Sequence, residues 1–327
     1  MNENAIPIVP LVTGIDEIEA DPSVFSKVIG QKEACNKLAF FVESHSPATP
    51  FPTMLLTGAP GLGKTFASGK VAEALGRELV EVNCGTYDTT NAFVEGVLMS
   101  MVMGDNPKTI LLDEAHKLSS EVTTILLTLL NPNESCRNYL RYKNWILEYD
   151  FSKINVIFST TDAHKMFKPL LNRCVEVYFH SYSEAELYRI LKSYLPKVKI
   201  DTSRTDISCA CRGRARDAFV LAQHIKRYTA MRDTNVLDEK GWKELKGVFG
   251  IYPHGLNSQE IQLLKILKKH APLSCRNLAI HMKVNERNIE SELEVHPRSL
   301  GFIESGPKGR RLTKEGKTYL TSITVNK

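Results

Sequence analysis

The chain has 327 residues, of which 43% are hydrophobic, and a formal net charge of +5. This length and apolar content predict two or three domains with real cores. The seven cysteines lack the C-x-x-C spacing of a zinc or redox centre, and the sequence shows neither a basic-then-apolar leader nor an apolar run of membrane-spanning length, so we expect reduced thiols and a soluble, cytoplasmic protein.

Residues 1–21 carry five acidic side chains and no Lys or Arg, and we expect them to form a loosely held lead-in. Between residues 22 and 182, apolar runs alternate with helical patterns, which predicts a parallel α/β sheet. The expected strands are Thr53–Thr57, Leu79–Asn83, Thr109–Asp113, Ile154–Thr160 and Val175–Phe179.

A nucleotide-binding loop follows the first expected strand. The run Gly58-Ala59-Pro60-Gly61-Leu62-Gly63-Lys64-Thr65 matches the pattern G-x-x-x-x-G-K-[ST], and a helical pattern begins at Phe66. Glycines let backbone N–H groups wrap a polyphosphate, and the following helix adds a favourable dipole. Lys64 is expected to reach the β- and γ-phosphates, and the Thr65 hydroxyl to bind Mg²⁺. The ATP-binding residues predicted here are Gly58, Gly61, Leu62, Gly63, Lys64, Thr65 and Phe66.

The strand at 109–113 ends in two carboxylates, Asp113 and Glu114. The carboxyl end of a parallel strand next to a nucleotide loop is where a metal-orienting acid belongs. We therefore expect Asp113 to hold the hydration shell of Mg²⁺ and Glu114 to polarise the attacking water. Paired acids that simply end a strand are the structural alternative.

Three further positions are typical of an ATP-driven ring. Thr161 directly follows the strand at 154–160 and is placed to sense the γ-phosphate or its water. Arg173 precedes the last strand, where an arginine points away from its own nucleotide and serves a neighbouring subunit as a finger. Arg216 opens a helix in the next domain and is expected to fold back on the γ-phosphate.

The second half of the chain predicts two smaller domains. Residues 183–252 have helical periodicity and predict a helical lid, and residues 251–255 break that pattern as a linker. Residues 253–327 predict three short helices, the first capped by Asn257 and Glu260 and the second by Ser274, followed by a hairpin. This order predicts a winged helix.

The winged helix carries 13 basic and 7 acidic side chains, which favours a polyanionic partner. The third helix, from Glu286, is acidic and is not expected to enter a DNA groove. The hairpin carries Lys308, Arg310 and Arg311, and we expect these to contact DNA phosphates without reading sequence. A winged helix used for protein contacts is the alternative.

The whole chain resembles the RuvB family of Holliday-junction branch-migration motors, within the AAA+ ATPases. The motifs that carry the resemblance are Ile29-Gly30-Gln31, Pro60-Gly61-Leu62-Gly63-Lys64-Thr65, Asp113-Glu114-Ala115-His116, Thr160-Thr161, Arg173, Arg212-Gly213 with Arg216, Gly255-Leu256, Asn277-Leu278-Ala279, Gly301-Phe302-Ile303 and Gly309-Arg310.

The resemblance implies a five-stranded AAA+ sheet, a helical lid and a winged helix, assembled as a hexamer around duplex or four-way-junction DNA. It also implies residue roles: adenine contacts from Ile29 and Gly30, with Tyr182 on the other face; catalysis by Lys64, Asp113 and Glu114; Thr161 as first sensor; Arg173 as a finger supplied in trans; and Arg216 as second sensor.

The sequence departs from the family at two places. Asp21-Pro22 replaces a usual Arg-Pro pair, and residues 133–145 do not match the hairpin through which the family docks on its partner RuvA. A different partner, or none, therefore stays open. Two other functions also stay open: a clamp loader or helicase loader, and a regulatory ATPase whose winged helix is an adaptor.

Overall fold

The computed structural model describes residues 24–103, 106–131 and 135–325. The chain divides into two compact units, one formed by the chain up to Thr57 with Thr65–Tyr178, the other by Gly58–Lys64 with the chain from Phe179 onward. The expected acidic lead-in at 1–21 lies outside the described residues.

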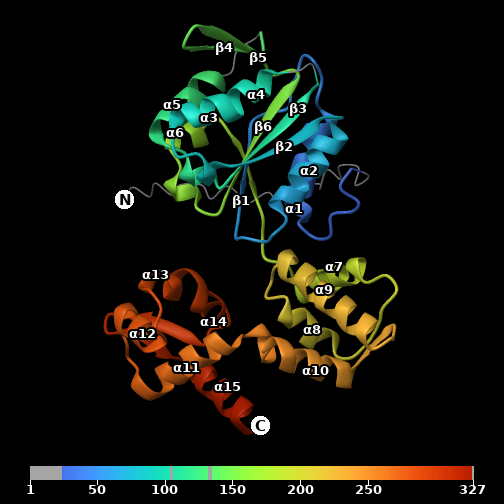
Figure 1. Ribbon diagram of the computed structural model, residues 1–327, viewed down its shortest axis with the longest axis vertical. Helices are drawn as coiled ribbons and strands as arrows, with labels where there is room; N and C mark the ends of the chain where they lie inside the picture. Colours follow the sequence, from blue (N-terminus) through green and yellow to red (C-terminus); the bar gives the residue numbers. More distant parts are fainter. Residues whose placement is uncertain (1–23, 104–105, 132–134, 326–327) are drawn as a thin grey trace, which may run out of the picture. The chain divides into compact units, whose positions relative to one another are not determined.

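The first unit is built on a five-stranded parallel sheet of order β2-β3-β6-β1-β7 (Figure 1). The prediction of a parallel sheet is confirmed, and each expected strand has its counterpart within one residue at either end. The strands are β1 (Met54–Thr57), β2 (Glu78–Asn83), β3 (Lys108–Asp113), β6 (Ile154–Thr160) and β7 (Val175–Tyr178).

Helices cover both faces of this sheet. One face packs Ile110, Leu112 and Phe158 against apolar side chains of α3 (Thr90–Phe93), the π-helical turn η2 (Val94–Leu98), α4 (Met99–Val102) and α5 (Ser120–Leu129). Figure 1 shows α1 (Lys32–Glu43) and α2 (Lys64–Ala74) on the opposite side from α3 and α5. The central strands β1, β3 and β6 are buried along most of their length and read as continuous apolar runs, whereas the edge strands β2 and β7 are mostly exposed or half-buried and contain glutamates.

Between α5 and β6 the chain forms an antiparallel hairpin of β4 (Arg137–Tyr142) and β5 (Trp145–Asp150). This hairpin was not predicted from the sequence, in which residues 133–145 only differ from the family pattern. Tyr149 is fully buried and its hydroxyl donates to the Leu98 carbonyl over 3.0 Å, which anchors the hairpin to the sheet unit. The short 3-10 and helical turns that follow β6 are η4 (Ala163–Lys165) and α6 (Lys168–Leu171).

The expected lid is helical, with four helices: α7 (Glu184–Tyr194), α8 (Arg204–Ala210), α9 (Ala215–Met231) and α10 (Glu239–Phe249). A capping box between Ser183 and Glu186 starts α7. The sequence analysis did not anticipate the short parallel pair of β8 (Lys199–Asp201) and β9 (Val236–Asp238). Strands of three residues carry too little periodicity to be distinguished from loops.

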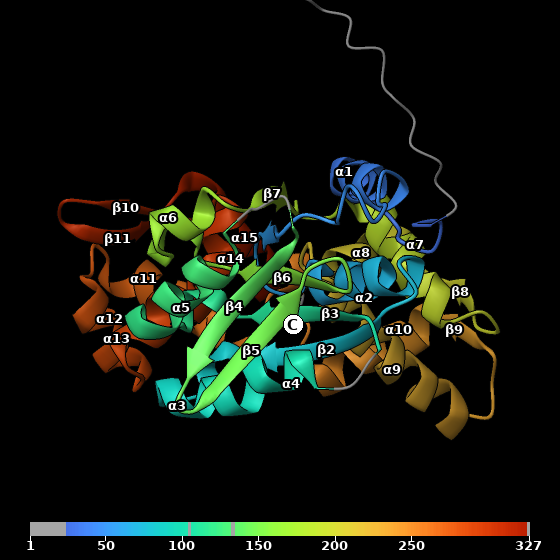
Figure 2. The ribbon, with the colours of Figure 1, turned by 90° about the horizontal axis from the view of Figure 1, so that it is seen from above.

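The last part of the chain is a winged helix, as predicted. Asn257 and Glu260 form the expected capping box of α11 (Ser258–His270), and the Ser274 hydroxyl caps α12 (Cys275–Met282). The third helix is divided into α13 (Glu286–Asn288), the π-helical turn η6 (Ile289–Leu293) and α14 (Val295–Ser299). The wing of β10 (Ile303–Gly306) and β11 (Gly309–Leu312) projects from the domain (Figure 2). A closing helix, α15 (Lys314–Val325), was not predicted.

All seven cysteines are free thiols. Within the described part of the chain, no helix has the length and apolar content that a membrane crossing requires.

Candidate nucleotide and DNA-binding sites

The nucleotide loop depends on glycines at three positions. Gly58, Gly61 and Gly63 have φ of 139°, 79° and 93°, in the region that side-chain-bearing residues rarely occupy. A Cβ at Gly58 would lie 2.5 Å from the Phe179 carbonyl oxygen, so this position also excludes a side chain by space. The three glycines therefore permit a backbone conformation that residues with side chains would rarely adopt at these positions.

Lys64 lies inside this loop. Its side chain is buried, and its ammonium donates to the carbonyls of Gly58 over 2.7 Å and Ala59 over 2.9 Å. These contacts hold the ammonium group inside the glycine-rich loop. A lysine in such a loop is where the β- and γ-phosphates of a nucleotide are expected to bind.

Two predicted residues of the second unit lie against the loop. The Tyr182 hydroxyl donates to the Leu62 carbonyl over 2.9 Å, and a Cβ on Gly63 would lie 3.1 Å from that hydroxyl. The backbone N–H of Arg216 donates to the Gly61 carbonyl over 3.2 Å, so the start of α9 is joined directly to the loop. The Arg216 side chain is exposed. Nucleotide loop and lid helix thus share a backbone hydrogen bond.

In the first unit, β3 ends at Asp113, and Glu114 follows with φ 55° and ψ 41°. A left-handed backbone at a glutamate costs on the order of 1–2 kcal/mol, and such strain concentrates at functional sites. The Glu114 carboxylate lies 3.6 Å from both His116 Nε2 and Lys117 Nζ. The local turn therefore positions the expected catalytic acid among cationic or donor groups.

The end of β6 lies beside the turn that contains Glu114. His116 Nδ1 lies 2.9 Å from the Thr160 hydroxyl oxygen, and that oxygen also accepts the Asp162 N–H over 3.0 Å. If the Thr160 hydroxyl donates to Nδ1, the ring proton is on Nε2 and faces Glu114. Local sequence patterns predict a role for Thr161 but none for His116, although His116 stands two residues after Glu114.

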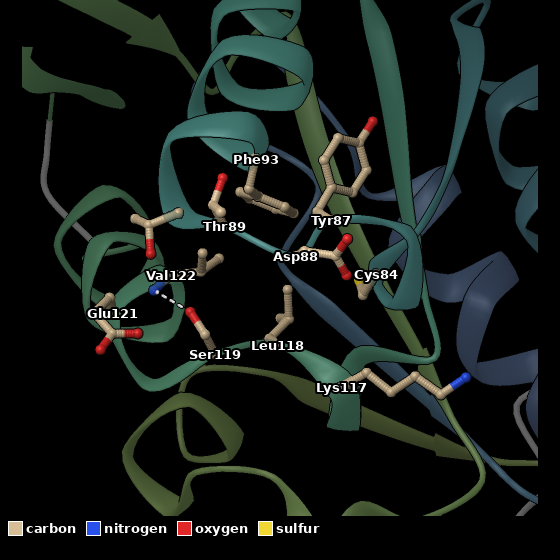
Figure 3. A pocket seen from close by; sticks show the side chains of 11 residues that line it. Cys84, Tyr87, Asp88, Thr89, Phe93, Lys117, Leu118, Ser119, Glu121 and Val122 are labelled. Carbon is tan, nitrogen blue, oxygen red and sulfur yellow. Dashed lines mark hydrogen bonds between the residues drawn. The ribbon is translucent and has the colours of Figure 1, made fainter.

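A cavity of about 260 Å³ adjoins this edge of the sheet (Figure 3). It is lined by Asp88, Thr89, Lys117, Ser119 and residues packed around them, and the Val122 N–H donates to the Ser119 hydroxyl over 3.2 Å. Burial raises the pKa of the Cys84 thiol at its wall to about 12, and the charges of Asp113 and Glu114 contribute to the increase. The walls of the cavity include none of the predicted nucleotide residues.

The other predicted ATPase residues are Arg173, Ile29 and Gly30. The Arg173 guanidinium donates to the Leu127 carbonyl near the end of α5. Ile29 and Gly30 precede α1, and Gly30 has φ 71°. The prediction that Arg173 serves a neighbouring copy concerns an assembly, and it stays a prediction.

The three cations of the wing differ in their exposure and in their bonding partners. The Arg310 guanidinium is largely buried and bonds Glu294 over 3.0 Å and Glu290 over 2.9 Å, and these carboxylates raise the pKa of Arg310. Arg311 bonds Glu304 over 2.8 Å but is two-thirds exposed, and Lys308 is exposed. The three predicted DNA contacts are therefore not equivalent, since Arg310 already has two carboxylate partners.

The donor chemistry near the loop fits magnesium. Thr65 and Asp113 offer a hydroxyl and a carboxylate, which are the hard oxygen ligands that Mg²⁺ prefers. Among the described residues, no group of three or more His, Cys, Asp or Glu side chains converges as a complete protein-only metal site.

Two family models match separate parts of the chain. The AAA model, the ATPase family associated with various cellular activities, matches residues 54–182, and the RuvB C-terminal winged helix domain model matches residues 253–321. The Holliday junction branch migration complex subunit RuvB of Ehrlichia canis (strain Jake) is 27% identical over 311 residues, covering 91% of this chain and 92% of that protein. The subunit of the same name from a Wolbachia of Drosophila simulans (strain wRi) is 25% identical and covers 94% and 96%.

A solved structure agrees on the fold. The Thermotoga maritima RuvB Holliday junction branch migration motor matches with a TM-score of 0.74 at 20% identity, covering 90% of this chain and 96% of that one. Because its identity is low, this likeness carries the fold, whereas the family models carry the assignment. The chain therefore contains an AAA domain at 54–182 and a RuvB-type C-terminal winged-helix domain at 253–321, and it is similar over nearly its whole length to RuvB subunits.

Proposed function

We propose that this protein is an ATP-hydrolysing motor that drives branch migration of four-way DNA junctions. The observation that carries the proposal is the presence, in one chain, of the nucleotide loop at 58–65 and a tail that matches the RuvB winged-helix model. The relatives that match nearly the whole chain are subunits of Holliday junction branch migration complexes. A loader that places another protein on DNA is not favoured, because loaders of this kind seldom end in a winged helix.

In this proposal the loop N–H groups and Lys64 bind the ATP phosphates. Thr65 and Asp113 hold Mg²⁺, which neutralises charge on the phosphates when bound. Glu114 orients and polarises the attacking water, and its place is set by the left-handed turn and by His116. Ile29, Gly30 and Tyr182 enclose the adenine, and Tyr182 already bonds the loop.

Nucleotide state reaches the lid through Arg216. The hydrogen bond between the Arg216 N–H and the Gly61 carbonyl ties the start of α9 to the loop, so a change in loop conformation on hydrolysis tilts the lid. Thr161 reports on the γ-phosphate from the end of β6. Arg173 completes the site of a neighbouring copy, which makes hydrolysis depend on a ring, expected to be a hexamer.

The docking of a junction-binding partner is assigned to the hairpin of β4 and β5. Tyr139, Trp145 and Ile146 are exposed by 56%, 63% and 72%. Exposed aromatic and aliphatic side chains of this kind are typical of interface anchors. Since residues 133–145 differ from the family at this place, a RuvA-like partner would need a correspondingly different surface.

The deciding experiment is branch migration of a synthetic four-way junction by the purified full chain, with ATP and with a non-hydrolysable analogue. We expect product only with ATP, and none from Glu114→Gln. ATP hydrolysis by wild type without any junction movement, with or without added partners, would overturn the motor assignment.

A second experiment tests the proposal that Arg173 completes the site of a neighbouring copy. Arg173→Ala subunits and Lys64→Ala subunits are each expected to lack ATPase activity, and mixing them should restore part of it, because intact loops then face intact fingers. Mixtures that stay inactive at every ratio would contradict supply in trans.

A further inference from the structure

The charges of the winged helix are separated along the chain. Residues 261–285 contain the cations Lys265, Lys268, Lys269, Arg276 and Lys283, two histidines and no acidic residue. The next nine residues, 286–294, contain four glutamates and one arginine. The basic stretch forms α11 and α12, and the acidic stretch forms α13 and η6. Two neighbouring elements of one small domain therefore carry opposite charge.

The cations of α11 and α12 are available to a ligand. All five are exposed, and within the described residues none of their side chains makes a hydrogen bond or an ion pair. The wing differs, because Arg310 and Arg311 are bonded to Glu290, Glu294 and Glu304. An incoming phosphate must compete with these carboxylates at the wing, whereas at α11 and α12 it displaces only water.

Helix geometry gathers the three lysines. Lys265, Lys268 and Lys269 stand at i, i+3 and i+4 of α11 and therefore share one face, opposite the buried Leu263 and Leu267. The His270 ring stacks on His281 of α12 with centroids 4.8 Å apart, so the end of α11 and the end of α12 present one continuous surface.

The wing is held beside this surface. Leu273, in the loop between α11 and α12, exchanges two backbone hydrogen bonds with Arg310 of β11, of 3.1 and 2.7 Å. Gly309 permits this approach, since a Cβ there would lie 2.3 Å from the Leu273 carbonyl oxygen. The exposed Lys308 therefore extends from a strand that is clamped to the α11–α12 loop.

We propose that the exposed cations that begin with the lysine face of α11 and continue along α12 to its C-cap, Lys265, Lys268, Lys269, Arg276 and Lys283, bind the phosphate backbone of duplex DNA. The inference rests on the proposed function, and names the surface with which the motor binds duplex DNA. The eight residues of α12 span about 12 Å, the length of roughly three to four base pairs at 3.4 Å each. Lysines on flexible stems contact phosphates without reading bases, as sliding along any sequence requires.

The test compares matched pairs of lysines in the full chain. Lys268→Gln with Lys269→Gln removes two charges from the proposed face. Lys314→Gln with Lys317→Gln removes two charges from exposed positions of α15 in the same domain. Binding of a labelled duplex of mixed sequence is measured by fluorescence anisotropy between about 50 and 200 mM salt, the range over which phosphate contacts change affinity most visibly.

We expect the first pair to weaken binding and to lower the magnitude of the slope of log K against log salt by about 2, one for each lost phosphate contact. The control pair should leave the slope unchanged. Both pairs should leave the melting temperature of the protein unchanged, because all four side chains are exposed.

Equal slopes for wild type and the first pair would overturn the proposal, and would leave the motor function standing if the junction is still moved by ATP. The proposal would also be overturned if the first pair kept its DNA slope but lost binding to vesicles containing phosphatidylserine, since the face would then recognise an anionic membrane. A wild-type protein that binds DNA with the expected slope difference but moves no junction would contradict the proposed function and support this surface.

Discussion

The nucleotide loop and the winged helix carry function in different ways. In the loop, three glycines with positive φ and one buried lysine form a shape that tolerates few substitutions. On the winged helix, the candidate contacts are exposed side chains on α11, α12 and the wing. In the nucleotide loop each residue is therefore expected to be indispensable. On the winged helix, each of many side chains is expected to contribute a small part of the DNA affinity. Substitutions in the two regions, and in the contacts that support them, test this difference.

The largest effect is expected at Glu114. Glu114→Gln keeps the size of the side chain but cannot act as a base, so kcat should fall by roughly 10²–10⁴-fold while ATP still binds. Lys64→Ala should abolish binding as well, because the loop then lacks its cation. Steady-state hydrolysis together with equilibrium binding of a fluorescent ATP analogue distinguishes the two. Retained turnover in Glu114→Gln would remove this residue from the chemistry.

The next largest effect concerns the buried ion pair of Arg212 and Glu260. Glu260 is 1% exposed, accepts the Asn257 N–H over 2.8 Å and bonds the Arg212 guanidinium. Burial raises the pKa of Glu260, although Arg212 and the Asn257 N–H both oppose the shift. Glu260→Ala leaves a cation without its anion and should lower the free energy of unfolding by about 3–5 kcal/mol.

Urea unfolding of the full chain measures this change. Glu260→Gln is the matched control, since its amide oxygen still accepts the Asn257 N–H, and it should cost less than the alanine. If both variants were as stable as wild type, the pair would be no part of what holds the second unit together.

A pH effect is expected at His296. Burial lowers the pKa of His296 from 6.5 to about 4, and the nearby Arg212 and Arg214 add to the decrease, while the hydrogen bond to the His254 carbonyl over 2.8 Å opposes it. Between these two values the unfolded chain binds a proton that the folded chain does not. Stability is therefore fully present above pH 6.5 and falls toward pH 4, by up to about 3 kcal/mol.

His296→Gln removes this titration while keeping an N–H that can reach the His254 carbonyl. Unfolding midpoints in urea from pH 7 downward should fall less steeply for this variant than for wild type, measured at the same intervals. Parallel pH profiles would show that other groups, and not His296, govern the acid sensitivity of the domain.

The smallest effects are expected at the wing, where substitutions of the two neighbouring arginines should affect different properties. Arg310→Ala leaves Glu294, which is 3% exposed, with Arg298 as its remaining ion-pair partner, and should cost roughly 1–3 kcal/mol of stability. Arg311→Ala should leave stability unchanged and lower the salt slope of DNA binding by about 1. Thermal melting and salt-titrated DNA binding, run on both variants, provide the comparison. A reversed pattern would show that Arg310 leaves its carboxylates to bind DNA.

Local patterns identified much of this molecule. Continuous apolar runs predict the three central strands because these are buried on both faces. The spacing of Asn257 and Glu260 predicts the start of α11 because a capping box is a contact within four residues. The hairpin at 137–150 and the short pair β8–β9 were missed. Their strands alternate or are very short, and their stability comes from partners elsewhere, such as the Leu98 carbonyl that holds Tyr149.

The nucleotide loop, the acidic strand end and the order of the domains could be predicted from the chain alone, because they depend on neighbouring residues and on backbone rules that every chain obeys. The three basic residues of the wing were predicted in the same way. The fold was needed to show that His116 lies between Glu114 and Thr160, and that Arg310 is bonded to Glu294 and Glu290 while the lysines of α11 are not. Pairing between side chains far apart in the sequence depends on where the fold brings them, and local sequence patterns do not contain that information.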